Sequence, residues 1–484
     1  MPHRSVGHQP APTADTSAGG NAPPHGGLMM FLLALAQFMV ILDVTVVNVA
    51  LPDIGASLGL DRASLTTVVT SYITAFGSLL ILGGRLADAW GRKAMFLAGL
   101  VLFTAASVAS GLATGGTVLL VSRVVQGVGA AMLSPSALSI LTTEFTGRDR
   151  HRVLGVWGAV GGAGAAVGVL VGGLLTSGPG WRWAFLINVP AGLIVLVGVL
   201  LVVPARRPTP ARVDIPGAIA GTTAVGLLIY ALTRAGDVGW GSWRVLLPLA
   251  ASVVGFLVFL AIERRAAAPL VPLPLLRRPP LPGPAAVMLS GSVILMSTFF
   301  LMSVYLQRVR EFSALETGLL FLPVAVAAGL GAHLSAQLIA KTGARPVAAT
   351  GLGLASAGLL VLGVAGNAVD SHVWLVDLPA FMAMSLGIGA TFVTATVSAL
   401  TAVDHERAGL ASGILNTGHE LGGSLGIAVV STVAATGIAT GSTAGFGPAF
   451  LLVAGVGAVL AVLAASVLLP PGRPVMPDEP MLMH

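Results

Sequence analysis

The segment Gly84-Arg85-Leu86-Ala87-Asp88-Ala89-Trp90-Gly91-Arg92-Lys93 joins two long apolar runs, residues 64–86 and 94–113. It is rich in charge, whereas only 9% of the whole chain is charged. Gly84 lets a neighbouring membrane helix approach closely. The Asp88 carboxylate at the end of the first run can accept hydrogen bonds from Arg92 or from the N-terminus of a neighbouring helix. The segment therefore predicts a tight polar turn between two closely packed membrane helices.

The composition of the chain indicates a polytopic membrane protein. The 484 residues are 55% hydrophobic and have a mean hydropathy of +0.93, whereas soluble proteins carry about 25% charged residues. The absence of cysteine excludes disulfides and thiolate metal sites. The net charge of +6 would suggest a nucleic-acid partner in a soluble protein. Membrane topology explains this charge better, so we expect the lipid bilayer and no nucleic acid as a partner.

Fourteen apolar runs are long enough to cross a bilayer as helices. All are too long for the strands of a membrane barrel, so the predicted fold class is all-α integral membrane. The runs cover residues 28–52, 64–86, 94–113, 117–142, 153–176, 183–203, 214–234, 243–262, 284–307, 315–339, 345–365, 373–400, 407–435 and 446–469.

The distribution of Lys and Arg predicts the orientation. With the N-terminus inside, 18 of the 25 basic residues fall in cytoplasmic segments and 6 in outside segments, and this bias places both termini in the cytoplasm. The remaining residue, Arg123, lies within a span. Arg outnumbers Lys 23 to 2, which is typical of GC-rich bacterial genomes, so we expect a bacterial plasma membrane.

Two Pro-rich, basic segments, 204–212 and 264–284, divide the spans into six, two and six. The expected parts are a disordered cytoplasmic tail (1–27), an N-terminal six-helix bundle (28–203), two linking helices with basic loops (204–283), a C-terminal six-helix bundle (284–469) and a cytoplasmic tail (470–484). The turn at 335–345 repeats the pattern of 84–93, with a Gly followed by a cation. Duplicated bundles with a midplane site between them are a transporter design.

One carboxylate, Asp43, interrupts the apolar run from Leu28 to Pro52. A charge at that depth costs about 2.5–3.5 kcal/mol on insertion scales, which predicts a partner and a use. At about 1.5 Å per residue, Asp43 and Arg123 lie at similar depths, roughly 10–14 Å below the outer surface, and can pair. A carboxylate that moves between pairing and isolation can take up and release a proton. A static structural ion pair is the alternative.

Several segments carry a resemblance to one family. Residues 84–93 resemble the signature of the major facilitator superfamily, and residues 120–131 resemble its helix-4 motif. Residues 155–173 look like its antiporter motif of helix 5. Together with residues 42–52, residues 181–190 and the fourteen spans, they resemble the fourteen-helix drug:proton antiporter family, over about residues 28–470.

This resemblance implies roles for particular residues. The turn would latch the cytoplasmic side in an outward-open state, and the glycines of the fifth span would form an antiporter-type seam. One departure is Val169, where the family pattern has Pro; its loss removes an expected kink and leaves a purely packing role open. The implied latch residues are Gly84, Asp88, Gly91 and Arg92, and the seam residues are Gly161, Gly164, Gly168, Gly172 and Gly173.

Glu420 is the other buried acid that the sequence predicts. It lies about thirteen residues into its span, roughly 20 Å deep and near the midplane. We expect a second proton site or a cation-recognition site there, with an acid satisfied by backbone and Ser groups as the alternative. Helix packing is the alternative for the aromatic and polar side chains that we expect in a substrate cavity. These cavity candidates are Trp157, Asn48, Phe299, Tyr305, Asn416 and His419.

The sequence therefore predicts a proton-coupled secondary transporter that exports amphipathic or cationic drugs or antibiotics by alternating access, with Asp43, Arg123 and Glu420 as proton-coupling residues. A symporter or facilitator for a specific metabolite remains an alternative, as does a non-transporting receptor, although the loops are too short for a signalling domain. No nucleotide-binding loop is present, so the energy would come from an ion gradient. We expect a monomer, no enzyme activity, no cofactor besides the coupling proton and no metal.

Overall fold

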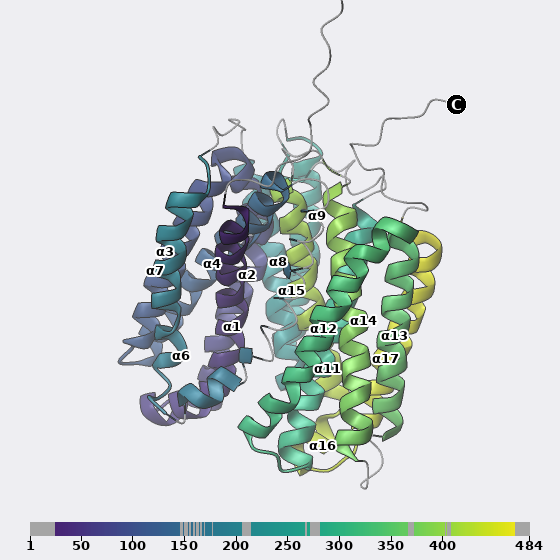
Figure 1. Ribbon diagram of the computed structural model, residues 1–484. Coiled ribbons are helices and arrows are strands. Elements are labelled where there is room, and N and C mark those ends of the chain that lie inside the picture. Colours follow the sequence, from purple (N-terminus) through teal and green to yellow (C-terminus); the bar gives the residue numbers. More distant parts are fainter. Residues whose placement is uncertain are drawn as a thin grey trace, which may run out of the picture.

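The protein is described by a computed structural model in which the long helices run between the two ends of the molecule (Figure 1). The structure describes residues 25–145, 178–205, 214–266, 269–271, 281–365, 372–401 and 408–469, together with 149, 153, 156, 157, 160, 164, 167, 168, 170–176 and 403.

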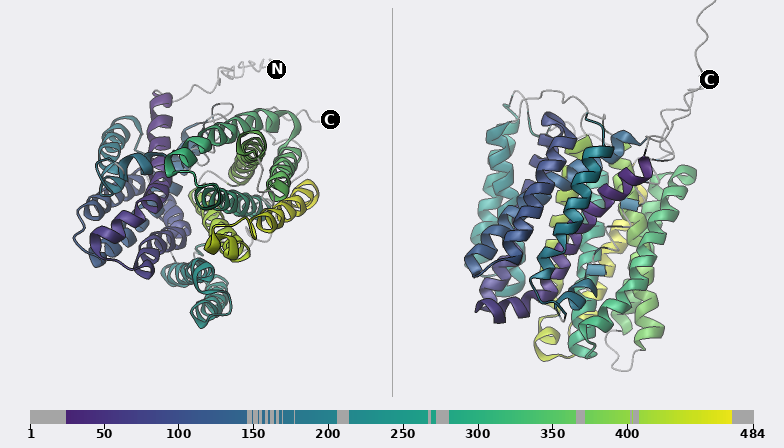
Figure 2. Two further views of the ribbon diagram at one scale, coloured as in Figure 1. Left: turned by 90° about the horizontal axis from the view of Figure 1, so that it is seen from below. Right: turned by 60° about the vertical axis from the view of Figure 1, so that its left-hand side comes forward.

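The helices form two groups and a separate pair (Figure 2). The N-terminal group contains α1 (Gly26–Leu58), α2 (Arg62–Trp90), α3 (Arg92–Gly111), α4 (Gly116–Glu144), α6 (Trp183–Leu186) and α7 (Asn188–Val202). The pair is α8 (Ile215–Val238) and α9 (Trp243–Glu263). The C-terminal group contains α11 (Pro282–Val304), η1 (Tyr305–Val309), α12 (Ala314–Thr342), α13 (Ala344–Ala365), η2 (Val373–Asp377), α14 (Leu378–Thr401), α15 (Ala408–Val433), α16 (Ala435–Thr440), α17 (Phe446–Leu463) and η4 (Ala464–Leu468).

Local sequence explains where several helices begin and end. Asp61 accepts a hydrogen bond from the Ser64 N–H (2.9 Å) and caps α2. Hydrogen bonding from the side chain of Ser64, and then from its backbone N–H, lowers the pKa of the Asp61 carboxyl because it favours the charged form. At their other ends, α2 and α12 both stop at a glycine with positive φ, Gly91 (103°) and Gly343 (90°), a backbone conformation that other residues rarely adopt. The two turns that look alike in the sequence thus have the same backbone geometry.

Twelve helices within the described residues are long and apolar enough to cross a membrane. α15 is not among them, since Asn416, His419 and Glu420 lower its hydropathy, and the predicted span at 153–176 lies partly outside the described residues. The count of fourteen spans therefore stays a prediction. The predicted sixth span is interrupted at Ile187, between α6 and α7.

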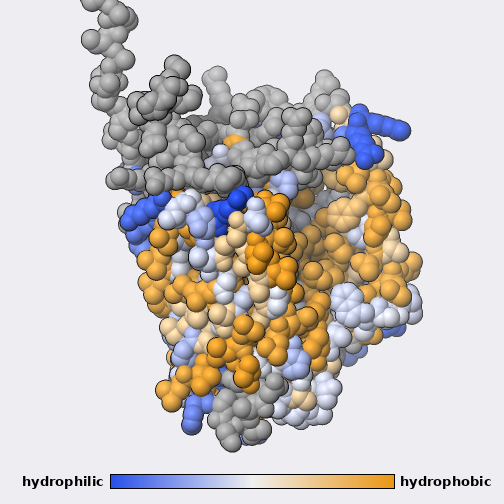
Figure 3. All heavy atoms as spheres, turned by 90° about the vertical axis from the view of Figure 1, so that its right-hand side faces the viewer, coloured by the Kyte–Doolittle hydropathy of each residue, from blue (hydrophilic) through white to orange (hydrophobic). Residues whose placement is uncertain are grey.

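Apolar side chains cover the outer surface of the helices. In Figure 3 they form a broad band across the middle of one face, and hydrophilic residues lie toward its two ends. Large exposed residues of α13 and α17, such as Leu360, Val364, Val459 and Val462, belong to this surface. Such a band is what a lipid environment requires of the outer face.

The two groups meet where α15 packs against α2 and α4. We call the end of the molecule that contains Trp90 and Ala408 the latch end; it is the upper end in Figure 1. The pair α8–α9 lies outside this seam, and α8 contacts both α2 and α15 (Figure 2).

Candidate functional site

Asp43 of α1 and Arg123 of α4 form an ion pair, and both side chains are fully buried. Glycines on α4 make this arrangement possible. A Cβ placed on Gly127 would lie 2.7 Å from the backbone oxygen of Tyr72, so α4 and α2 lie in close backbone contact. This approach brings the Tyr72 ring over the guanidinium, with 4.1 Å between the ring centroid and Arg123 Cζ.

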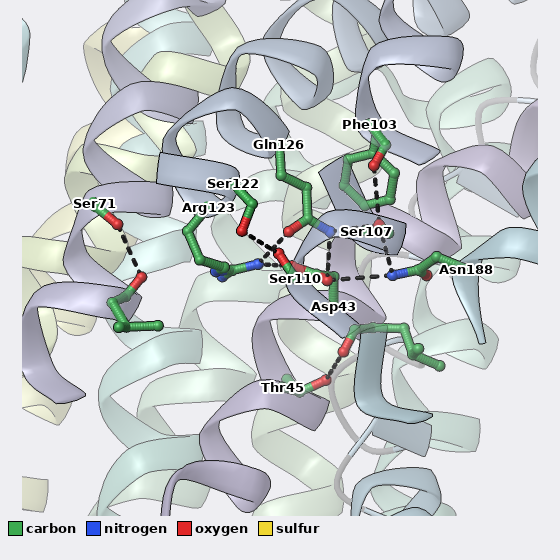
Figure 4. A network of polar contacts seen from close by, with 12 residues as sticks. Asp43, Thr45, Ser71, Phe103, Ser107, Ser110, Ser122, Arg123, Gln126 and Asn188 are labelled. Atoms are coloured by element: carbon green, nitrogen blue, oxygen red, sulfur yellow. Dashed lines mark hydrogen bonds and ion pairs between the residues drawn. The ribbon is translucent and has the colours of Figure 1, made fainter. Parts of the chain in front are cut away.

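Three side chains, Ser107, Gln126 and Asn188, surround the carboxylate of Asp43; we call them the polar cage (Figure 4). Gln126 Nε2 donates to Asp43 Oδ1 (2.8 Å) and Asn188 Nδ2 donates to the same oxygen (3.2 Å). Ser107 Oγ accepts from Gln126 Nε2 (2.8 Å). Arg123 Nη1 donates both to Asp43 Oδ2 and to Gln126 Oε1. Each hydrogen bond from the cage to Asp43 is therefore donated by an amide N–H group.

The guanidinium also has unpaired donors. Arg123 Nε and Nη2 are buried and have no hydrogen-bond acceptor among the described residues. They belong to a group that is covered by Tyr72 and lies 5.8 Å from the ring centroid of Phe185. Protonation of Asp43 would leave this buried charge without its counter-ion, which is costly in a dry interior. A change in the charge of Asp43 must therefore be accompanied by a change in its surroundings.

The charged turn at residues 84–93 connects the two groups at the latch end. The Asp88 carboxylate accepts hydrogen bonds from the N–H groups of Gly409 (3.1 Å) and Leu410 (3.0 Å), at the N-terminus of α15. Arg92 Nη2 lies 3.5 Å from Asp88 Oδ1. A Cβ on Gly84 would collide with the carbonyl oxygen of Gly409, so these helices are in backbone contact. Gly91 forms the turn at the end of α2.

Three of the five glycines predicted as a seam face α1. A Cβ on Gly164 would meet Ile41, one on Gly168 would meet Thr45 and one on Gly172 would meet Val49. These α1 residues are four apart and therefore share one face of the helix. A Cβ on Gly173 would meet nothing within 4 Å. Gly161 and Val169 lie outside the described residues.

Glu420 lies in the other group, and its side chain packs against α2. A Cβ on Gly77 would lie 3.3 Å from Glu420 Cβ. The Glu420 side chain is half-buried, and no hydrogen bond to it is found within the described part of the chain. Tyr72 lies within electrostatic reach of Glu420 as well as of Asp43 and Arg123.

The predicted cavity residues are divided between the interior and the seam. Phe299 packs edge to face on Phe321 and Phe381, and Tyr305 packs on Phe446, so both are packing residues of the C-terminal group in this conformation.

Trp157 is buried in the core and Asn48 is exposed. Asn416 and His419 of α15 are half-buried. Asn416 Nδ2 approaches Ser134 Oγ of α4 (3.4 Å), and the His419 ring contacts Phe392. Of these four residues, Asn416 is the one seen to contact the opposite group.

Sequence reasoning missed the polar cage and Tyr72. Gln126 and Asn188 stand within segments already identified as motifs, and each is an amide inside an apolar span, which was the available indication. Ser107 offered none, because hydroxyl side chains are common in membrane helices and usually bond to their own backbone.

The comparisons with known proteins agree with this architecture. The model of the Major Facilitator Superfamily matches residues 33–427. The chain is 36% identical to the puromycin resistance protein of Streptomyces alboniger, over 90% of this chain and 86% of that protein. It is 37% identical to the cephamycin export protein of Amycolatopsis lactamdurans, over 91% of each.

Among solved structures, the proton:xylose symporter XylE superposes with a TM-score of 0.66 at 13% identity, covering 92% of this chain and 96% of that one. At this level of identity the likeness concerns the fold alone.

Proposed function

The chain belongs to the major facilitator superfamily, and we propose that it exports amphipathic antibiotics or drugs in exchange for protons. The relatives named for puromycin resistance and cephamycin export support drug export. The observation that supports proton coupling is the ion pair of Asp43 and Arg123, which is fully buried in the N-terminal group.

In this proposal Asp43 is the proton carrier. Its carboxylate is ionised while it pairs with Arg123, and a proton neutralises it when the groups rearrange and water reaches the pair. Because each state of the site favours a different arrangement of its surroundings, proton binding biases the equilibrium between conformations. Arg123 holds the charge that makes this difference large.

Glu420 is the proposed meeting point of proton and substrate. Its carboxylate lies at the seam between the groups without a described hydrogen-bond partner, so a cationic drug or a proton can neutralise it. Asn416 and His419 on the same helix are the polar neighbours that would orient a bound molecule. Competition between proton and drug at Glu420 would give exchange.

The latch supplies the conformational step. Asp88 holds the N-terminus of α15, a favourable place for a carboxylate because of the helix dipole. Breaking these bonds would open the latch end, which the positive-inside bias assigns to the cytoplasm. The protein would then work as a monomer in a bacterial plasma membrane with both termini cytoplasmic, with protons as its coupling ion and no other cofactor.

The test is transport in proteoliposomes under an imposed pH gradient, with puromycin and a cephamycin as first probes. Wild type should move the drug only when a gradient is present, and Asp43→Asn should lose gradient-driven movement. Glu420→Gln should reduce the transport of a cationic drug more than the transport of a neutral drug. Gradient-driven transport that persists in both variants, or no drug transport by wild type, would overturn the proposal. Movement of drug in the same direction as the protons would instead identify a symporter.

A further inference from the structure

The side-chain amide of Asn188 donates hydrogen bonds through its NH2 group, but its oxygen accepts none within the described structure. Asn188 begins α7 directly after the break at Ile187, and it is 1% exposed. Its Nδ2 donates to Asp43 Oδ1 (3.2 Å) and approaches Ser107 Oγ (3.5 Å). Its Oδ1 is buried and receives no hydrogen bond within the described structure. An amide oxygen left unpaired in a dry interior costs free energy, so its position next to a titratable group needs a reason.

The other amide of the polar cage is fixed in orientation. Gln126 Oε1 accepts from Arg123 Nη1 (2.8 Å), while its Nε2 donates to Asp43 and to Ser107. Turning this amide over would place its NH2 group against the guanidinium. Asn188 is free of that constraint, because no described group donates to its oxygen.

We propose that Asn188 is a positioning residue that serves both protonation states of Asp43; this inference rests on the proposed proton coupling. While Asp43 is ionised, Asn188 Nδ2 donates to Oδ1, as observed. When a proton from water binds Oδ1, the new O–H group needs an acceptor. Rotation of the Asn188 amide about its Cβ–Cγ bond presents Oδ1 to that O–H group, and no bond other than the carboxylic O–H forms.

The surroundings of Asp43 leave this role to Asn188. The charged or titratable groups around Asp43 are Arg123 of α4 and Tyr72 of α2. Glu420 of α15 acts electrostatically on Tyr72 from the C-terminal group. The remaining cage residues, Ser107 of α3 and Gln126 of α4, are uncharged, and the hydroxyl of Ser107 already donates to the carbonyl of Phe103 (2.9 Å).

Transport by Asn188→Leu and Asn188→Ser tests the role. Leu removes donor and acceptor, so gradient-driven transport should fall about tenfold, the equivalent of one hydrogen bond to a charged group. Ser keeps a hydroxyl that both donates and accepts, and should restore part of the activity. Thr142→Val is the matched control, since the Thr142 hydroxyl is buried in α4 and bonds only to its own helix.

Infrared difference spectra between high and low pH give a readout that a merely structural role would not move. The side-chain amide C=O bands should change together with the carboxylic band of Asp43. Gln126 also donates to Asp43, so only the Asn188 component of these bands should be missing in Asn188→Leu. If Asn188→Leu transports like Thr142→Val, or if its amide bands equal those of wild type, Asn188 has no such role. In that case the proposed function would still stand if Asp43→Asn loses gradient-driven transport. The proposed function itself would be overturned if wild type shows no gradient-driven transport.

A second inference concerns the α8–α9 pair, which bridges the seam on the outside of the molecule. Away from the latch end, Arg234 Nη2 of α8 donates to Thr67 Oγ1 of α2 (3.3 Å). Trp240 Nε1, in the turn after α8, donates to Thr432 Oγ1 of α15 (3.1 Å). The pair is therefore tied to both groups.

At the latch end, a buried acid of the α8–α9 pair accepts hydrogen bonds from the segment that follows α9. Glu263, the last residue of α9, is 4% exposed and accepts the N–H groups of Leu270 (3.0 Å) and Val271 (3.2 Å). The side chains of Leu270 and Val271 are buried in one cluster with Leu410. The Leu410 N–H group is one of the two that donate to Asp88. The chain after α9 therefore packs on the latch itself.

We infer that the α8–α9 pair holds the latch closed, with Glu263 fixing the segment that covers Leu410. The chain has no cysteine, so spin labels on Trp90→Cys of α2 and Ala340→Cys of α12 can report the opening of the latch end in the full-length protein. Both positions are exposed. Glu263→Gln should raise the population at the longer label distance at least about threefold, because one charged acceptor of two N–H groups is lost.

Leu270→Ala is the second variant, since it removes the side chain that packs in the Leu410 cluster and keeps both hydrogen bonds to Glu263. It should shift the distances in the same direction. Glu316→Gln is the matched control, an acid that accepts a backbone N–H at the start of α12, away from the latch. Distances that stay unchanged in both Glu263→Gln and Leu270→Ala would overturn the inference. A shift of equal size in Glu316→Gln would do so as well.

Discussion

Lys93 and Arg345 make equivalent hydrogen bonds in the two helical groups. Lys93, two residues after Gly91, donates to the carbonyl oxygens of Leu200 (3.1 Å) and Val203 (2.5 Å) at the end of α7. Arg345, two residues after Gly343, donates through Nε (2.9 Å) and Nη2 (2.7 Å) to the Leu469 carbonyl beyond α17. Each cation thus caps the last helix of its own group, which supports the internal duplication inferred from the sequence.

Replacing either cation should therefore weaken its own group. Lys93→Met and Arg345→Met should each lower the free energy of unfolding by about 1 kcal/mol, the net value of one hydrogen bond. Equilibrium unfolding in mixed detergent micelles measures this. Lys341→Met, an exposed cation in the last turn of α12, serves as the control, and a loss of equal size there would mean that surface charge and not capping is responsible.

The buried ion pair predicts a pattern of non-additive stability. Asp43→Asn leaves Arg123 buried without a counter-ion and should cost about 3–5 kcal/mol, whereas Asp43→Asn with Arg123→Gln should cost less than Asp43→Asn alone. The same unfolding measurement on both single variants and the double variant completes the cycle. Additive losses would show that the two side chains are energetically independent.

The contact between Gly84 and Gly409 predicts a change in the latch equilibrium. Gly84→Ala places a methyl group against the Gly409 carbonyl, so the closed latch should lose population about tenfold relative to the open form, as overpacking requires. Spin labels at positions 90 and 340 measure the two populations. Gly353→Ala on α13, where a Cβ meets nothing within 4 Å, should leave them unchanged, and an unchanged distribution in Gly84→Ala would contradict the proposed closure.

The contact between α1 and the glycines of the fifth span predicts that one substitution can compensate for another. Gly168→Ala collides with the Thr45 side chain and should destabilise the protein by about 1–3 kcal/mol. It should also impair gradient-driven transport, because Thr45 lies two residues after Asp43. Thr45→Ala should restore most of both losses in the same chain. Gly173→Ala is the control in the same span, and failure of Thr45→Ala to rescue would place the damage elsewhere.

Much of the fold follows from residue order alone. A helix that crosses lipid must satisfy its backbone internally, so the apolar runs predict the helices well, and the charges at 84–93 and 335–345 predict where two of them end. The ion pair of Asp43 and Arg123 was also predictable, since a buried charge requires a counter-ion and equal depth limits the choice. The break at Ile187 was not predicted, because the run 183–203 is continuously apolar.

Which groups meet across the chain depends on how the helices pack. Residue order alone indicates a membrane protein with two deep carboxylates, Asp43 and Glu420, one deep guanidinium and a charged glycine turn. Only packing brought Asn188 to Asp43, Tyr72 over Arg123, Asp88 to the N-terminus of α15 and Leu270 onto Leu410. The physical reason is that depth along a span follows from position in the chain, whereas the rotation of each helix and the identity of its neighbours depend on the fit of side chains against glycines that the whole bundle supplies.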